Sequence, residues 1–328
     1  PPLAGEGKRA VCRVSCLPNP PPLAGEGREG ATRARKMLGW IDTVAQGVML
    51  GGLYGLFAIG LSLMFGVMRI VNIAHGDLIV LAAFGAIAAT TMAQWPLGVT
   101  VVAVIAAMYL VGYLLQRGVL NRTLSGGDLP PLLVTFGISI VIQNLLLEIF
   151  SADPRSLDAG GAETLSVTLT EGLTLGVLPL GTLAAALVIT AALQWLFGRT
   201  AIGRAFRATS DDPEVAQLMG IGTRHVYALA TAIALAVVAV AGVLLAMRTT
   251  VAPADGPNNL IYAFEAVIIG GLGSFWGTLA GGMILGVSQA IGFRVSPGWG
   301  AFAGHLVFLG ILAFRPAGLF PKTHEMSR

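Results

Sequence analysis

The sequence predicts an all-α, polytopic bundle of about eight or nine transmembrane segments, some of them broken or re-entrant. Of its 328 residues, 55% are hydrophobic and only 11% are charged, whereas soluble domains carry about 25% charged residues. Long apolar stretches alternate with short charged loops, which is the pattern of a multi-pass membrane protein. The 44 glycines agree with this class, because glycine is more frequent in membrane helices than in soluble ones.

Residues 1–36 depart from the membrane pattern and are predicted to be a disordered extension. The heptad PPLAGEG occurs at 1–7 and again at 21–27, and no apolar run between the repeats is long enough for a signal peptide. We expect Met37 to be the native start and residues 37–328 to form the transmembrane domain. A genuine basic tail is the alternative.

The extension distorts the statistics of the whole chain. Removing its seven basic and three acidic residues from the totals of 20 and 17 leaves 13 and 14, so the net charge falls from +3 to −1. The basic balance is therefore no indication of a nucleic-acid partner. Both cysteines, Cys12 and Cys16, also lie in the extension, so the membrane body has no disulfide, thiol nucleophile or thiolate metal site.

Eight apolar stretches approach the roughly 20 residues that a spanning helix needs. The seventh is too long for one span and is interrupted by GGLGS at Gly270–Ser274, so it is predicted to form two short or broken helices. In chain order the stretches are Val44–Met64, Leu78–Met92, Leu97–Leu115, Leu132–Phe150, Val177–Phe197, Val226–Met247, Leu260–Ile291 and Ala301–Phe314.

The basic residues of the short loops predict the orientation, because cytoplasmic loops are enriched in lysine and arginine. The loops at 116–129 and 198–225 and the tail after 314 are basic and should face the cytoplasm. The loop at 151–176 has four acidic residues against one arginine and should face outward, as should the loop at 248–259. The side of the N-terminus stays open.

A polar cluster interrupts the apolar pattern at Arg69–Val80, RIVNIAHGDLIV, where Arg69, Asn72, His75 and Asp77 lie within nine residues. A charge at the centre of a membrane helix costs roughly 2.5–3.5 kcal/mol on insertion scales, so such groups line a wet cavity, pair, or lie at an interface. With Gly66 and Gly76 on either side, 65–77 is predicted to be a break or re-entrant turn, because glycine permits irregular backbone.

The residues of the cluster are expected to have different roles. Asn72 and His75 are the best candidates to face the translocation path, to which Gly76, Asp77 and Glu265 are also assigned. Asp77 is expected to cap the next helix, because an acid suits the positive end of the helix dipole. A plain interfacial loop with its polar groups at the lipid headgroups is the alternative.

The segment at 198–223 is the longest cytoplasmic connection and is predicted to hold two short helices. Asp211–Glu214, DDPE, is typical of a helix start, with an acidic cap, proline in the first turn and a further acid. Val215, Leu218 and Met219 give that helix an apolar face, and glycines end it. The face could fit the groove of a partner protein or lie on the membrane surface.

Other polar residues carry weaker signals. Glu265 lies inside the broken apolar segment and could line a pore or lie near the outer surface. Gln143, Asn144 and Glu148 are expected to make packing or interface contacts, and His305 is expected to be a lone packing residue on an apolar helix.

Enzymatic activity is not predicted. An intramembrane serine protease would need a nucleophile and a base, but the surroundings of Ser274 do not contain Gly-x-Ser-x-Gly. The chain has no Walker A motif and no cluster of residues at metal-ligand spacing, so neither ATP nor a metal is expected to bind here.

Three long motifs resemble one family, the permease subunits of branched-chain amino acid ABC importers. GGLYGLFAIGLSLMFGVMRIVNIAHGDLIVLAAFGA at Gly51–Ala86 resembles the family's first signature. GRAFRATSDDPEVAQLMGI at Gly203–Ile221 is similar to its cytoplasmic coupling loop, and FEAVIIGGLGSFWGTLAGGMILGVSQA at Phe264–Ala290 to its C-terminal signature. The likeness extends from about Val44 to Phe320.

The resemblance implies a subunit of a bacterial inner-membrane importer that binds no cofactor itself. Its partners would be a second permease in a heterodimer, two ATP-binding subunits and a periplasmic solute-binding protein. Urea and short amides are alternative solutes, and a self-sufficient channel is a less favoured function. The residues that match the coupling motif, and would contact the ATPase, are Arg204, Ala208, Asp211, Pro213, Glu214 and Gly220.

One departure from the family concerns the first signature. Asn72, His75 and Gly76 match it, whereas the next position is more often Glu in the family and is Asp77 here. The charge is retained but the side chain is shorter.

Overall fold

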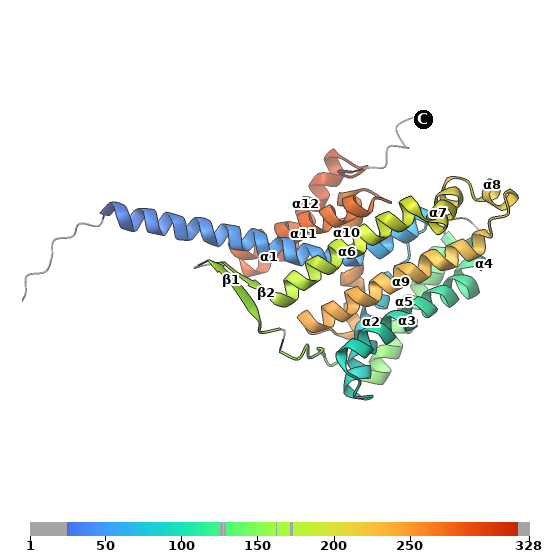
Figure 1. Ribbon diagram of the computed structural model, residues 1–328, viewed down its shortest axis with the longest axis horizontal. Coiled ribbons are helices and arrows are strands. Elements are labelled where there is room, and N and C mark those ends of the chain that lie inside the picture. The colour runs from blue at the N-terminus through green and yellow to red at the C-terminus, as the bar shows by residue number, and fades with distance from the viewer. Residues whose placement is uncertain (1–24, 125–126, 128, 162, 171–172, 321–328) are drawn as a thin grey trace, which may run out of the picture.

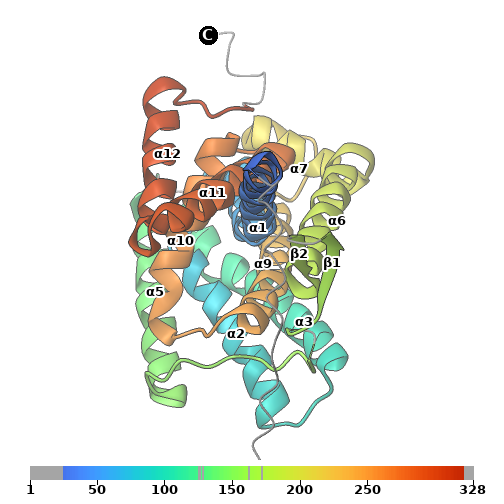
Figure 2. The same cartoon turned by 90° about the vertical axis from the view of Figure 1, so that its left-hand side faces the viewer.

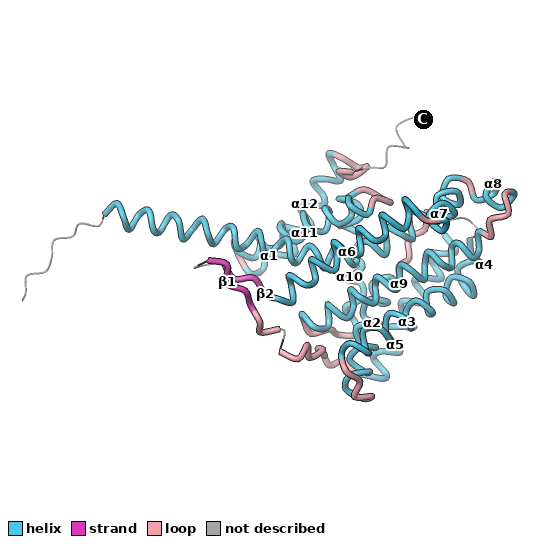
Figure 3. The backbone as a smooth tube through the Cα atoms, in the orientation of Figure 1, coloured by secondary structure: helices cyan, strands magenta, loops and turns pink. Residues whose placement is uncertain are grey.

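The structure of the chain, a computed structural model, describes residues 25–320 except 125–126, 128, 162 and 171–172 (Figure 1). Long helices dominate the described part, and one small antiparallel hairpin lies beside them (Figure 3). The long helices are α1 (Gly25–Met68), α2 (His75–Thr91), α3 (Leu97–Leu115), α5 (Leu129–Phe150), α6 (Val177–Arg199), α9 (Thr223–Arg248), α10 (Gly256–Gly270), α11 (Phe275–Val295) and α12 (Gly300–Phe314). The shorter elements are the π-helical turn η1 (Gln116–Leu120), α4 (Asn121–Thr123), β1 (Ser166–Thr170), β2 (Leu173–Gly176), α7 (Ala201–Asp211), α8 (Pro213–Leu218) and the 3₁₀ turns η3 (Pro253–Asp255) and η4 (Pro297–Trp299).

The predicted all-α membrane fold is confirmed, with a slightly lower count of spans. Seven helical segments of the described chain are long and apolar enough to cross a membrane, against the eight or nine expected. The difference arises because α2 and α10 have only 17 and 15 residues and belong to the two regions where the chain is broken. The break predicted at Gly270–Ser274 separates α10 from α11, and Gly271 and Gly273 there have positive φ of 99° and 78°.

The predicted extension lies mostly outside the described residues. Residues 1–24 are not among them, and residues 25–36 continue α1 as helix. Their sequence, GEGREGATRARK, includes the good helix formers Glu, Arg, Ala and Lys, next to a helix that is already formed. The domain boundary at Met37 therefore stays a prediction.

Helix α1 runs through the centre of the bundle, where α6, α9, α10 and α11 surround it (Figure 2). Its closest neighbour is α11, and small residues make that approach possible. A Cβ added at Gly51 would lie 2.3 Å from Met283 Cα, and one at Gly286 would lie 2.4 Å from the Gly47 carbonyl oxygen. Because apolar side chains gain little by leaving lipid, close backbone packing of this kind is what holds membrane helices together.

The two ends of the bundle match the predicted alternation of loops. At one end the Phe197 ring, close to α7, packs against Phe275 at the start of α11 with centroids 5.0 Å apart, and the tail returns there through a 3.2 Å bond from Phe320 N to Gly270 O. At the other end Gln46 of α1 donates to the carbonyl of Thr174 in β2 at 3.0 Å. The basic connection and tail thus share one end, and the acidic loop that contains the hairpin lies at the other.

Candidate functional site

The polar cluster at Arg69–Val80 forms a re-entrant turn against the inside of the bundle. Helix α1 ends at Met68, and Arg69 has a positive φ of 56°, which turns the chain back along α1. Asn72 Nδ2 reaches Met64 Sδ at 3.9 Å and His75 Nε2 reaches the Phe57 carbonyl oxygen at 2.8 Å. At the start of α2 the His75 side chain therefore reaches a carbonyl about three helical turns back along α1.

Burial distinguishes this turn from an interfacial loop. Asn72 and His75 are fully buried and Asp77 is 1% exposed, whereas Arg69 is exposed. The break predicted for 65–77 is confirmed, and the alternative of a loop at the headgroups is wrong for all but Arg69.

The glycines play a different part from the one expected. Gly66 lies within α1 and Gly76 within the first turn of α2, so neither forms the break. A Cβ on Gly76 would lie 1.9 Å from the Gly256 carbonyl oxygen. Gly76 is needed instead because α2 begins in direct contact with the backbone of α10.

The backbone of the turn finds its hydrogen-bond partners inside the protein. Asn72 Oδ1 accepts from Ala74 N at 3.0 Å, and the Asn72 carbonyl accepts from His75 N at 3.2 Å. Thr135 Oγ1 of α5 accepts from Ile73 N at 3.2 Å. Irregular backbone at membrane depth is tolerated only with such partners, so Asn72 closes the turn as well as being a candidate for the path.

The imidazole of His75 has one satisfied and one unsatisfied nitrogen. A carbonyl oxygen can only accept, so Nε2 carries the proton that is donated to Phe57. Nδ1 is then an acceptor, and it is buried without a hydrogen-bond partner among the described residues. A hydrogen-bond donor that reached this nitrogen would therefore be stabilised.

Asp77 does not cap α2, contrary to the prediction. The residue before the helix is Ala74, and no side chain of the described residues caps it. The Asp77 carboxylate points to α5 instead, where Ser139 Oγ donates to Oδ2 at 2.5 Å and Gln143 Nε2 donates to Oδ1 at 2.9 Å. These two neutral donors satisfy both oxygens of the buried acid, as a buried polar group requires.

The partners on α5 share a pattern that sequence reasoning missed. Thr135, Ser139 and Gln143 are spaced four residues apart and lie on the face of α5 that meets the re-entrant turn and α2. Polar residues at that spacing share one side of a helix, and this stripe in an otherwise apolar segment was the available signal. The expectation that Gln143 makes packing contacts is confirmed.

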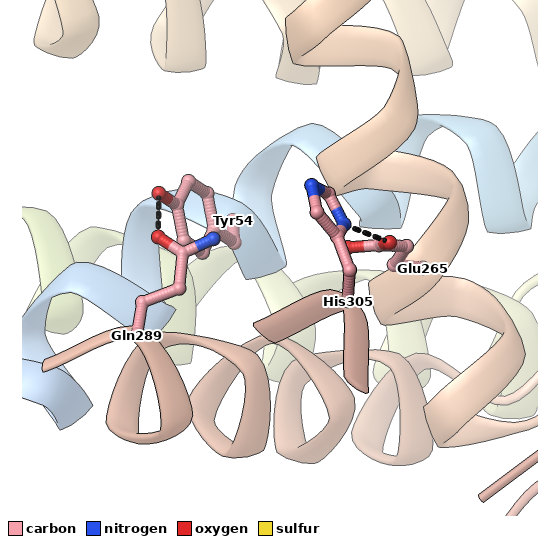
Figure 4. A network of polar contacts seen from close by, with 4 residues as sticks. All are labelled: Tyr54, Glu265, Gln289 and His305. Carbon is pink, nitrogen blue, oxygen red and sulfur yellow. Dashed lines mark hydrogen bonds and ion pairs between the residues drawn. The ribbon is translucent and has the colours of Figure 1, made fainter. Parts of the chain in front are cut away.

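Glu265 belongs to a second polar cluster, drawn in Figure 4, in which His305 is partly exposed. Its Oε1 lies 2.5 Å from Nδ1 of His305 on α12, and the glutamate is only 4% exposed. Nearby, Tyr54 Oη of α1 donates to Gln289 Oε1 of α11 at 2.7 Å. The interpretation of His305 as a lone packing residue is wrong, because its partner lies 40 residues away on another helix. Glu265 forms no hydrogen bond with Asn72, His75 or Asp77 in the described structure.

The connection at 198–223 folds as predicted, into α7 and α8 with a sharp turn between them. Asp212 Oδ1 accepts from Glu214 N at 2.9 Å and Val215 N at 3.0 Å, and Pro213 occupies the first turn. Gly220, with φ of 83°, ends the segment. Leu218 and Met219 are 86% and 78% exposed, so α8 presents an apolar face to its surroundings.

The residues that match the coupling motif lie on the surface of this pair of helices. Arg204, Asp211, Pro213, Glu214 and Gly220 are exposed, and Ala208 is half-buried. Beneath them, Ser210 Oγ donates to the Gly66 carbonyl oxygen at 2.7 Å. That bond joins α7 to the last turn of α1, immediately before the re-entrant turn.

Comparisons with known proteins agree with this architecture. The family described as branched-chain amino acid transport system / permease component matches residues 43–313. The high-affinity branched-chain amino acid transport system permease protein BraD of Pseudomonas aeruginosa is 30% identical, over 86% of this chain and 96% of its own length. The corresponding protein LivH of Escherichia coli K12 is 31% identical, over 79% of this chain and 87% of its own.

A more distant relative is the probable branched-chain amino acid transport permease protein LivH of Methanocaldococcus jannaschii. It is 26% identical, over 74% of this chain and 78% of its own length. No solved structure matches the chain. The family match across most of the chain and the apolar helices of the bundle lead to one conclusion: the chain belongs to the permease components of branched-chain amino acid transport systems, and it is a multi-pass protein of the inner membrane.

Proposed function

We propose that this chain forms part of the translocation path of an importer for branched-chain amino acids or related small solutes, driven by ATP that is bound on separate subunits. Its relatives are named for branched-chain amino acid transport. Its partners in the complete transporter would be a second permease, two ATPase subunits and a periplasmic binding protein that delivers the solute. The permease itself would bind no nucleotide.

One observation carries the ATP-driven part of this proposal. Helices α7 and α8 form an ordered, exposed element at the basic end of the bundle, with an apolar face on α8 and charged residues on both helices. An amphipathic helix with large exposed apolar side chains suits the groove of a partner protein. Arg204 and Glu214 would fix its orientation in the ATPase, with Ala208, Asp211, Pro213 and Gly220 shaping the contact.

The contacts of α7 give a route by which this docking could reach the path. Ser210 bonds to the last turn of α1, and the re-entrant turn starts three residues after Gly66. A shift of α7 would therefore displace Arg69 and the turn, and so move α2 relative to α1. We place Asn72, His75, Gly76 and Asp77 at this moving junction, and Glu265 in the neighbouring polar cluster.

The experiment uses the complete transport system, reconstituted in proteoliposomes. We expect Arg204→Ala combined with Glu214→Ala to abolish ATP-driven leucine uptake while membrane insertion and yield stay normal. The matched control is Arg122→Gln, an exposed arginine at the same end of the bundle but outside α7 and α8. Normal uptake in the double variant would refute the coupling assignment.

A second preparation tests the need for the ATPase. The permease alone is placed in liposomes, and leucine flux is measured without nucleotide. We expect no flux above that of empty liposomes. Appreciable flux would favour a self-sufficient channel over an importer subunit.

A further inference from the structure

A pocket with several charged groups lies at the hairpin end of the bundle, between α1, α9 and α11. Its volume is about 300 Å³, which is at the small end of the range of about 300–1,000 Å³ for ligand pockets. Its wall is formed by Asp42, Thr43, Gln46, Leu50, Arg248, Ala290, Phe293 and Arg294.

Two arginines that form no ion pair within the described residues contribute positive charge to the pocket. Arg248 makes one long contact with the Met49 carbonyl oxygen, at 3.4 Å. Arg294 donates to the Gly39 carbonyl and to Thr43 Oγ1, and its guanidinium lies 4.5 Å from the centre of the Trp40 ring. Within the described residues neither arginine is in an ion pair. The planar guanidinium is the side chain best suited to bind a carboxylate through two parallel hydrogen bonds.

The same pocket contains an acid that is also unsatisfied. Asp42 Oδ1 is buried and has no hydrogen-bond partner among the described residues. A buried carboxylate oxygen without a donor is costly, so a ligand that brings a positive donor would be stabilised here. A simple anion would meet repulsion from Asp42, whereas a ligand with both charges would not.

The remaining wall is apolar. Leu50, Ala290 and Phe293 contribute aliphatic and aromatic surface from α1 and α11. Paired cationic groups, a separate carboxylate and an apolar wall together match a small α-amino acid with an apolar side chain: the carboxylate toward the arginines, the ammonium toward Asp42 and the side chain toward Phe293.

The lining residues of the pocket are neighbours in sequence of polar residues deeper in the bundle. Leu50 is one helical turn from Tyr54 on α1, and Ala290 follows Gln289 on α11. Gln289 Nε2 is a further buried donor without a partner in the described chain. Tyr54 in turn stacks on Tyr262 of α10 with ring centroids 4.9 Å apart, and Tyr262 stacks on His305 at 6.2 Å.

We propose that this pocket, formed by Asp42, Arg248 and Arg294, is an entry subsite that binds the zwitterionic head of an amino acid before it moves inward. The inference rests on the proposed function and adds the residues that select the substrate class. Because the pocket would contact both the carboxylate and the ammonium of the ligand, removing either charge from the ligand should weaken binding.

The test uses the complete system in proteoliposomes during turnover, with a diazirine analogue of leucine as the probe. We expect photolabelling of the segments around Leu50 and Phe293. Leucine should suppress the labelling, whereas leucinamide, which lacks the carboxylate, and 4-methylpentanoate, which lacks the ammonium, should compete at least about tenfold more weakly.

Variants connect the labelling to the charges. Asp42→Asn and Arg248→Gln should each reduce labelling of this pocket by about tenfold or more. The controls Asp153→Asn and Arg122→Gln, exposed residues outside the pocket, should leave it unchanged. Equal labelling in the pocket variants and their controls would overturn the subsite.

Two further outcomes distinguish amino-acid binding in this pocket from binding at another place and from a bound lipid. If the wild-type system imports leucine but the probe labels segments outside the pocket, the subsite is refuted while the proposed function stands. If the system imports no amino acid, the proposed function itself is refuted. If mass spectrometry finds phosphatidylethanolamine bound to the wild type but lost from Arg248→Gln, and leucine does not displace it, the pocket holds a lipid headgroup and the subsite is refuted.

Discussion

The hydroxyl of Ser139 donates a 2.5 Å hydrogen bond to Oδ2 of Asp77, and thereby joins α5 to the first turn of α2. Gln143 donates to the other carboxylate oxygen at 2.9 Å. Asp77 also lies against α10, where a Cβ on Gly256 would be 1.8 Å from its Oδ1. One buried acid thus bonds to α5 and packs against α10 at the point where the chain re-enters the bundle.

The first prediction tests how much the hydrogen bond from Ser139 to Asp77 contributes to stability. Ser139→Ala removes one of two donors to a buried carboxylate, so we expect the free energy of unfolding to fall by about 1–3 kcal/mol. The measurement is thermal or denaturant unfolding of the purified chain in lipid nanodiscs. Asn144→Ala is the control, because Asn144 is an exposed residue of the same helix and its side chain donates to the Ile140 carbonyl of that helix, at 2.8 Å. Equal stability of the two variants would show that Asp77 does not depend on Ser139.

The second prediction concerns the contact between α2 and α10. Gly76→Ala would place a methyl group 1.9 Å from the Gly256 carbonyl oxygen, and backbone cannot move aside as a flexible side chain can. We expect a loss of stability of about 1–3 kcal/mol or more, seen as a lower unfolding temperature in nanodiscs.

Gly85→Ala is the control for that substitution. Gly85 lies on the same helix, and apart from its chain neighbours and the backbone of that helix, no atom of the described residues lies within 4 Å of the position of its Cβ. Alanine is the better helix former by up to about 1 kcal/mol, so this variant should be neutral or slightly stabilised. A Gly76→Ala variant as stable as Gly85→Ala would contradict the close approach of α2 to α10.

Much of the fold could be predicted from the sequence because it depends on local patterns. Apolar length gave the spans, GGLGS marked the break between α10 and α11, and the run DDPE gave the start of α8 through an acidic cap and proline. These signals lie within a few residues of the elements that they specify.

The site was less predictable because its contacts join distant segments. The partner of Asp77 is 62 residues away on α5 and the partner of Glu265 is 40 residues away on α12. No local rule distinguishes an acidic residue that caps its own helix from one whose side chain bonds to a different helix. The turn itself depends on the positive φ of Arg69, a conformation that a non-glycine residue rarely adopts. The nearby glycines were the more obvious candidates for the break, so the sequence did not point to Arg69.

The third prediction concerns the connection between the coupling helices and the re-entrant turn. Ser210 Oγ of α7 donates to the Gly66 carbonyl oxygen of α1 at 2.7 Å. Ser210→Ala removes this bond and leaves the exposed residues of α7 and α8 in place, so the ATPase should still dock and hydrolyse ATP. A movement of α7 would then be transmitted to α1 less completely. In the reconstituted system we expect leucine uptake per ATP hydrolysed to fall by about two- to thirtyfold, which corresponds to a coupling energy of about 0.5–2 kcal/mol.

Ser288→Ala is the control for the Ser210 variant, because the hydroxyl of Ser288 bonds within its own helix, to the Ile284 carbonyl at 2.7 Å. Uptake and ATP hydrolysis are measured on the same vesicles, so that the ratio is independent of yield. If both activities of Ser210→Ala fell together, the serine would matter for assembly or stability instead. An unchanged ratio would show that the movement reaches α1 by another contact, such as the junction of α6 and α7, where Gly203 packs against the Leu196 carbonyl oxygen.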